Sequence, residues 1–81
     1  MNVNASELMK RYEAGERDFQ GSSFISADLS KVNLSGASLQ AASLSEANLS
    51  QADLVGTNLR EASLSQANLS KANLSAANLN G

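Results

Sequence analysis

Residues 27–81 read as eleven consecutive five-residue units: ADLSK, VNLSG, ASLQA, ASLSE, ANLSQ, ADLVG, TNLRE, ASLSQ, ANLSK, ANLSA and ANLNG. The first position of a unit is usually alanine, the second is Asp, Asn or Ser, and the third is always leucine. Phe19 and Phe24 continue the third-position series backwards. The predicted structural core is therefore the set of third-position residues Phe19, Phe24, Leu29, Leu34, Leu39, Leu44, Leu49, Leu54, Leu59, Leu64, Leu69, Leu74 and Leu79. A repeat this regular decides the architecture before any other signal is considered.

A period of five fits neither regular secondary structure. On an α-helix, residues five apart are separated by about 140° after a full turn is removed, so the leucines would spread around the circumference. On a flat strand, an odd step would place successive leucines on opposite faces. A chain that turns a corner every five residues brings every leucine to the inside. The period therefore predicts a coil with short sides.

Each side of this coil is expected to point its first and third residues inward and its second residue outward. The fourth and fifth residues would form the corner. Serine, asparagine and glycine suit such corners, because Asn tolerates the left-handed conformation and Gly adopts it freely. Two large aliphatic residues fall at corner positions. We expect Ile25 to lie beneath an N-terminal cap and Val55 to be exposed alone.

Matches between outward residues twenty positions apart favour four sides per turn of the coil. Serine recurs in two such series, and asparagine and glycine recur in pairs. These matches are Ser23, Ser43 and Ser63; Ser30, Ser50 and Ser70; Asn48 and Asn68; Asn58 and Asn78; and Gly36 and Gly56.

The A(D/N)Lxx pattern over residues 17–81 resembles the pentapeptide-repeat family. The resemblance implies an all-β solenoid, a right-handed quadrilateral β-helix of about three coils. Departures are mild: Val32, Thr57 and Ser22 replace the first-position alanine, and Arg17 makes the Phe19 unit a transition. We therefore divide the chain into an N-terminal helical cap, residues 1–16, and a pentapeptide-repeat β-helix, residues 17–81.

The segment before the repeats predicts a short capping α-helix over residues 5–14. Asn4 is a good N-cap, Glu7 follows three residues later, and Val3 can pack on Leu8 as a hydrophobic staple. Gly15 is a natural stop. Since solenoids need capped ends, we expect the helix to cover the first coil; the alternative is a helix offered to a partner.

Within that helix, Leu8 and Tyr12 are the residues expected to make the contact with the coil. They would lie over Phe19 and Phe24, the two larger centres that begin the stack.

No comparable cap follows Leu79, after which the sequence reads Asn80 and Gly81. An unpaired edge is a template for another chain. The C-terminal coil, with Leu69, Leu74 and Leu79, is therefore a candidate end for homodimerisation. The alternatives are a frayed end and a longer array of repeats.

Composition argues against catalysis and metal binding. The chain has no histidine and no cysteine, which excludes Ser/His/Asp and Cys/His arrangements, disulfides and thiolate metal sites. Carboxylates remain on the repeats, but outward residues of a convex solenoid have no cleft that could perturb their pKa. They are Asp18, Asp28, Glu46, Asp53 and Glu61. We expect no catalytic residue, no cofactor and no metal, although Asp28 and Asp53 are the weak metal candidates.

The predicted function is a non-enzymatic structural or protein–protein interaction module with an unidentified protein partner. The alternative that the resemblance suggests is a DNA mimic that binds DNA gyrase, a topoisomerase. Duplex DNA would present about nine charges over a stack of about 15 Å. Residues 18–81 carry five acidic and three basic residues, a net of two negative charges, which disfavours mimicry. Ice or carbohydrate binding is a weaker alternative, since the chain has a single threonine.

Neither nucleic acid nor membrane is expected as a partner, because the net charge of the chain is only −2. The first residues contain no apolar segment of signal-peptide length, and no run approaches a membrane span. The sequence therefore predicts a soluble, cytoplasmic protein.

Overall fold

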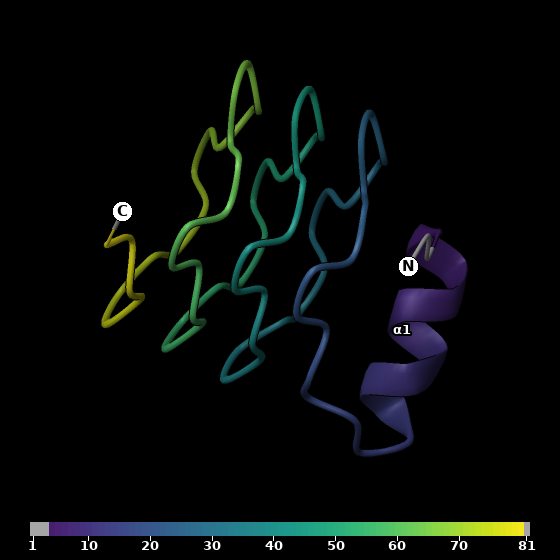
Figure 1. The fold of residues 1–81 in the computed structure, drawn as a ribbon. Coiled ribbons are helices and arrows are strands. Elements are labelled where there is room, and N and C mark those ends of the chain that lie inside the picture. The colour runs from purple at the N-terminus through teal and green to yellow at the C-terminus, as the bar shows by residue number, and fades with distance from the viewer. Residues whose placement is uncertain (1–3, 81) are drawn as a thin grey trace.

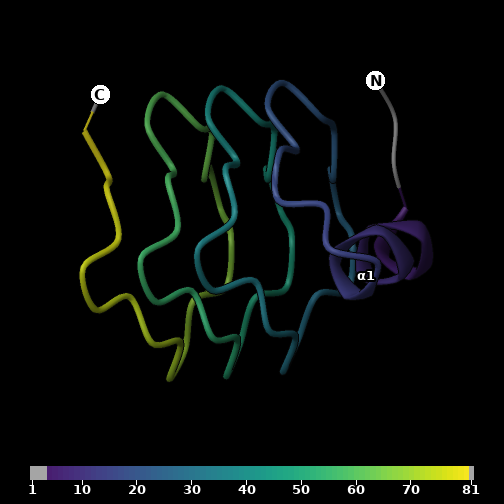
Figure 2. The same ribbon diagram turned by 90° about the horizontal axis from the view of Figure 1, so that it is seen from below.

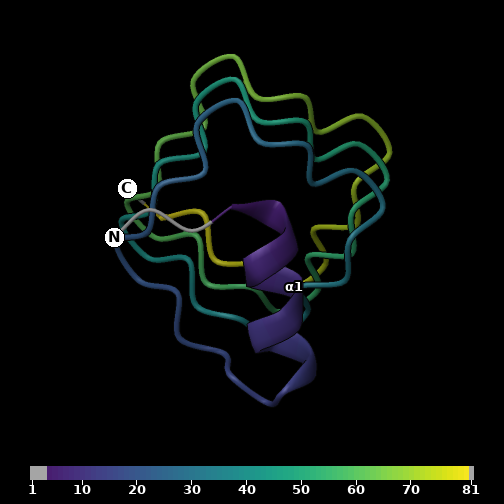
Figure 3. The ribbon, with the colours of Figure 1, turned by 90° about the vertical axis from the view of Figure 1, so that its right-hand side faces the viewer.

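The computed structural model describes residues 4–80. One helix, α1 (Ala5–Glu13), precedes a chain that winds repeatedly around a common axis. Figures 1 and 2 show α1 at one end of the stack of coils and the last coil at the other end. Figure 3 looks along the coil axis, with α1 across the near end.

Helix α1 begins where its sequence predicts and ends close to the predicted boundary. The Asn4 side chain accepts a hydrogen bond of 2.8 Å from the Glu7 N–H, which satisfies a donor that the first turn leaves free. Ala14 is the C-cap, and Gly15 follows with φ +102°. The helix thus ends one residue before the predicted boundary. The expected staple residue Val3 lies outside the described residues.

The coil has twenty residues per turn. Nine parallel β-bridges within residues 4–80 join second-position residues twenty apart, from Asp18↔Ser38 to Asn58↔Asn78. Twenty residues contain four units, so each turn has four sides. Pairing is by isolated bridges rather than by strands in the described chain, because the corners leave only a short extended stretch on each side.

In the middle of the stack, every backbone N–H of residues 47–51 has a partner. Ala47 donates to the Leu44 carbonyl across the corner, and Asn48 donates to Ala27 in the preceding coil. Leu49 and Gln51 donate to the following coil, and the Ser50 N–H bonds the Asn48 side chain. Since buried backbone groups must be paired, this complete pattern explains why neighbouring coils stack.

The third-position side chains fill the inside of the coil. Those of the first two coils and the start of the third are at most 2% exposed: Phe19, Phe24, Leu29, Leu34, Leu39, Leu44, Leu49, Leu54 and Leu59. First-position alanines such as Ala42 and Ala47 lie between them and are also buried.

The predicted core residues are less buried in the last coil than in the coils before it. Leu64, Leu69 and Leu74 are only partly buried. Leu79 is 52% exposed, so its assignment to the core is wrong for the single chain. The reason is geometric: no described coil stacks on these residues.

The corners differ from the prediction in the residue that adopts the left-handed conformation. It is the fifth residue of each unit, and nine of these are not glycine, with φ near +60°. Examples are Ala41, Gln51 and Lys71. Asparagine does not occupy this position. It stands second in the unit, where its side chain accepts a backbone hydrogen bond instead.

Candidate functional site: the two ends of the coil

The first coil has an N-terminal face, which α1 covers. Leu8 is fully buried and belongs to the same apolar cluster as Phe19 and Phe24. Met9 and Tyr12 are partly buried against this cluster. The helix therefore closes the end of the core, as expected of a cap with a polar outer face.

Tyr12 also secures the helix through a hydrogen bond that the sequence did not predict. Its hydroxyl donates a hydrogen bond of 2.7 Å to the Ser35 carbonyl, at the corner that follows Leu34. The Arg17 guanidinium lies 3.6 Å from the centre of the Tyr12 ring and donates to the Tyr12 carbonyl at 2.7 Å. One side chain thus satisfies a carbonyl of the first coil that has no preceding coil to bond.

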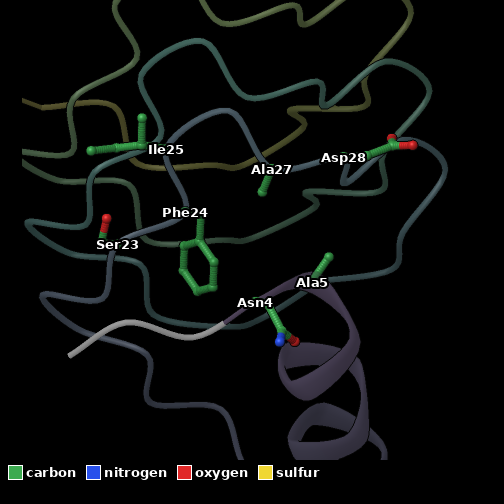
Figure 4. Close-up of a pocket in the computed structure, with 7 residues that line it drawn as sticks. All are labelled: Asn4, Ala5, Ser23, Phe24, Ile25, Ala27 and Asp28. Atoms are coloured by element: carbon green, nitrogen blue, oxygen red, sulfur yellow. The ribbon is translucent and has the colours of Figure 1, made fainter.

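An open hollow of about 650 Å³ lies beside the start of α1 (Figure 4). It is lined by Asn4, Ala5, Ser23, Phe24, Ile25, Ala27 and Asp28. Its one carboxylate, Asp28, is fully exposed, so the hollow lacks the paired acid and base that hydrolytic chemistry needs.

Two aliphatic side chains differ from their predicted placement. Ile25 is 57% exposed at the edge of the hollow and does not lie beneath the cap. Val55, expected to be exposed, is partly buried. Both differences reflect corner geometry that the period of five does not specify.

The opposite end of the stack, formed by residues 62–80, is a C-terminal face with unpaired backbone groups. In the middle coils, each third-position N–H donates to the following coil, and each first-position carbonyl accepts from it. Within residues 4–80, the corresponding groups of the last coil have no partner: the N–H groups of Leu64, Leu69, Leu74 and Leu79, and the carbonyls of Ala62, Ala67, Ala72 and Ala77.

Apolar side chains lie among these unpaired groups. Leu64, Leu69 and Leu74 are partly exposed, and Leu79 is the most exposed leucine of the described chain. The C-terminal face thus combines free hydrogen-bonding groups with apolar surface, which is the composition of an edge that binds another chain. The structure brings the three predicted residues Leu69, Leu74 and Leu79 together on this face.

The side faces consist of outward Asp, Asn and Ser residues, and the Asp and Asn side chains bond the neighbouring corners. Each Asp or Asn at the second position accepts, through Oδ1, a bond from the N–H two residues later. These residues are Asp18, Asp28, Asn33, Asn48, Asp53, Asn58, Asn68, Asn73 and Asn78. Sequence reasoning missed this role, although the strict choice of Asp or Asn followed by a corner is the signal of such a turn.

One such turn changes the pKa of Asp28. Hydrogen bonds from the Ser30 hydroxyl, at 2.7 Å, and from the Ser30 N–H lower the pKa of the Asp28 carboxyl below its ordinary value of 3.8. The carboxylate is thus held as part of the corner. Among residues 4–80 no group of three or more acidic side chains lies close enough to hold a metal ion.

No helix in the described part of the chain is long and apolar enough to span a membrane.

Comparisons with known structures agree with this architecture. The chain is similar to alr5209, a pentapeptide repeat protein from Nostoc Pcc 7120, with 37% identity, a TM-score of 0.78, and coverage of 95% of this chain and 75% of that one. It also resembles Rfr23 from the cyanobacterium Cyanothece 51142, with 32% identity and a TM-score of 0.68 over 69% of this chain. The match spans 38% of the length of Rfr23. No curated protein matched the chain.

The family comparison rests on the repeats themselves. A family model for pentapeptide repeats matches eight copies over residues 18–40 and 42–81. These two ranges include all of residues 27–81 except Ala41, and the match confirms the resemblance drawn from the sequence. The chain belongs to the pentapeptide-repeat family.

Proposed function

We propose that this chain is a non-enzymatic structural and protein–protein interaction module, built as a right-handed quadrilateral β-helix, and that its C-terminal face binds the partner. One observation carries the proposal: of the two ends of the stack of coils, one is covered by a helix and the other is not. The N-terminal face is covered by α1, with Leu8 fully buried. Within residues 4–80, N–H and carbonyl groups of the C-terminal face lack partners and surround partly exposed leucines.

The side faces support the same choice. Their Asp and Asn side chains already bond the corners, and their acids are dispersed around the coil. Asp18, Asp28, Glu46 and Asp53 belong to four different columns of residues spaced twenty apart. Such a surface does not provide the continuous negative stripe that a DNA mimic needs. We therefore expect no inhibition of DNA supercoiling by gyrase at stoichiometric amounts of this protein, in a standard supercoiling assay.

The interaction role is tested with two lysine variants. Leu79 and Ile25 are the two large aliphatic residues in the described chain that are more than half exposed, and they lie at opposite ends of the coil. The wild type and the variants Leu79→Lys and Ile25→Lys are immobilised, and the proteins that each one captures are compared. Each captured protein is then purified, and its binding to the three chains is measured by titration. Binding that is lost in Leu79→Lys alone supports the proposal; equal binding by all three contradicts it.

A further inference from the structure

We infer that the first coil has a peptide-binding edge of its own, along residues 22–24 beside the start of α1. The occupant is an extended segment of a partner protein, added as a β-strand, in which apolar residues alternate with lysine or arginine. This edge lies at the opposite end of the stack from the C-terminal face, and the inference goes beyond the role proposed for that face. It rests on unpaired backbone groups, on the hollow in front of them, and on the charge that lines the hollow.

The second residue of each side directs its N–H and its carbonyl toward the preceding coil. In the second coil, the Ser43 N–H donates to the Ser22 carbonyl, and the Ser43 carbonyl accepts from the Phe24 N–H. Ser23 holds the same position in the first coil, yet neither its N–H nor its carbonyl has a partner in the described chain. The same is true of both backbone groups of Asp28 on the next side. The first coil therefore offers the donor and the acceptor that an added parallel strand bonds.

Helix α1 covers the core at this end without pairing this edge. The backbone groups of a helix bond within the helix, so a helical cap can bury apolar side chains without completing a sheet. The Tyr12 hydroxyl bonds the Ser35 carbonyl, which belongs to the corner after a different side of the coil. Figure 3 shows that part of the outline of the coil lies clear of α1 in the view along the axis. The cap therefore leaves the backbone groups at Ser23 to another strand.

The hollow beside the start of α1 lies against this edge (Figure 4). Ser23 and Asp28 line it together with the apolar residues Phe24, Ile25 and Ala27. Successive side chains of an extended strand point to opposite faces. The residue opposite Ser23 would therefore point outward, as Ser23 does, and its two neighbours would point toward the apolar wall. A segment that alternates apolar and polar side chains fits this arrangement.

The charge of the hollow favours a basic segment. Of the residues that line it, only Asp28 is charged. Hydrogen bonds from the hydroxyl and the N–H of Ser30 lower the pKa of the Asp28 carboxyl, so this group is an anion at neutral pH. An anion at the rim attracts lysine or arginine and repels an acidic segment. Because Asp28 is fully exposed, its effect on affinity should be modest.

The first experiment titrates three short capped peptides into the isotope-labelled protein and follows the backbone amides by NMR. The probe alternates valine with lysine. One control has glutamate in place of lysine, and the other has N-methylated valines, which keep the side chains but lose the N–H donors. We expect the probe to shift the amides of Ser23 and Asp28, the glutamate peptide to bind more weakly, and the N-methylated peptide to bind roughly tenfold more weakly. No binding of the probe, equal binding of the N-methylated peptide, or shifts confined to the C-terminal face would overturn the inference.

Two matched variants, Asp28→Asn and Asp53→Asn, test the charge. Each removes one negative charge and keeps a side-chain oxygen for its turn, as Asn48 does one coil after Asp28. Asp53 lies on another side, in the middle of the stack. We expect Asp28→Asn to bind the probe about two- to fivefold more weakly and to lose its preference over the glutamate peptide. Asp53→Asn should bind as the wild type does, and equal effects of the two variants would overturn the choice of a basic segment.

Amide hydrogen exchange tests whether the edge is open in the free protein. Ser23 and Ser43 occupy equivalent positions one coil apart, but in the described chain only the Ser43 N–H has a partner, the Ser22 carbonyl at 2.9 Å. Without peptide, the Ser23 amide should exchange quickly and the Ser43 amide slowly, and a saturating amount of the probe should slow the exchange of Ser23. A Ser23 amide that is already as slow as that of Ser43, or that the probe does not slow, would overturn the inference. Either result would leave the role proposed for the C-terminal face to its own capture experiment.

Discussion

Two hydroxyl-bearing residues occupy first positions in the core, and their environments differ. Thr57 is buried, and its hydroxyl donates a hydrogen bond of 2.9 Å to the Leu34 carbonyl. Ser22 is equally buried, but among residues 4–80 its hydroxyl has no hydrogen-bond partner. A buried polar group without a partner costs free energy, so Thr57 stabilises the coil and Ser22 weakens it.

Replacing Ser22 with alanine should therefore stabilise the protein. Alanine is the residue that stands twenty positions later, at Ala42, so the change fits the column. We expect Ser22→Ala to raise the free energy of unfolding by about 1 kcal/mol, measured by denaturant titration. Thr57→Ala is the control and should lower it. The interpretation fails if Ser22→Ala is the destabilising variant.

The Asp28 turn makes a prediction about pH. Because its pKa is lowered in the folded chain, the Asp28 carboxylate contributes stability above its unfolded pKa. That contribution is lost as the pH falls through the folded pKa, below the ordinary value of 3.8. In an NMR titration, Ser30→Ala should raise the pKa of Asp28 toward its ordinary value, since the Ser30 hydroxyl is the first cause of the shift. An unchanged pKa in Ser30→Ala would contradict this assignment.

At the residue scale, the sequence predicted which side chains point into the core better than it predicted what the corner residues do. The register of Leu29 or Leu54 follows from the period alone, because only an inward direction buries every fifth residue. The left-handed residues at the corners, such as Gln51 with φ +60°, could not be recognised from the sequence. At an exposed corner, backbone hydrogen bonds to the next coil offset the free-energy cost of the left-handed conformation. Almost any residue type can therefore occupy that position.

At the scale of the element, α1 is the only helix of the described chain, and it acts as a lid on the first coil. The start and the end of α1 could be predicted because their signals are local in the sequence. Asn4 and Glu7 mark the start, and Gly15 marks the end. The bond from Tyr12 to Ser35 was not readable, since the two residues are 23 positions apart and their meeting depends on how the helix crosses the coil.

This bond can be isolated by Tyr12→Phe, which removes the hydroxyl and keeps the ring that packs on the core and under Arg17. We expect a loss of about 1 kcal/mol in the free energy of unfolding, measured by chemical denaturation. Tyr12→Ala removes the ring as well and should cost more. Equal losses in the two variants would mean that the hydroxyl bond carries the whole contribution, and no loss in Tyr12→Phe would mean that it carries none.

At the scale of the whole molecule, stability comes from coils that stack on their neighbours, so the position of a change along the axis decides its effect. Within residues 4–80, middle coils are bonded to a neighbouring coil on both sides, whereas the last coil is bonded on one side. The sequence predicted this stack and an uncapped C-terminal coil, but it assigned all thirteen third-position residues to the core, because the repeat itself does not show how deeply each coil is buried.

Matched substitutions at Leu54 and Leu79 should therefore have opposite outcomes. Leu54 is fully buried and Leu79 is 52% exposed. Leu54→Asp should unfold the domain, since a buried carboxylate without a partner costs several kcal/mol. Leu79→Asp should stay folded, with a cooperative thermal transition by circular dichroism. A folded Leu54→Asp protein would contradict the inward direction of the leucines.

The account depends most on the claim that the last coil presents an unfilled edge, and residue-resolved amide hydrogen exchange tests it directly. Leu49 and Leu69 occupy equivalent positions one coil apart, but only the Leu49 N–H has a partner within residues 4–80, the Asn68 carbonyl at 2.7 Å. The Leu69 amide should exchange quickly while the Leu49 amide is protected. If the Leu69 amide is as protected as that of Leu49, the edge is already filled and the account is wrong.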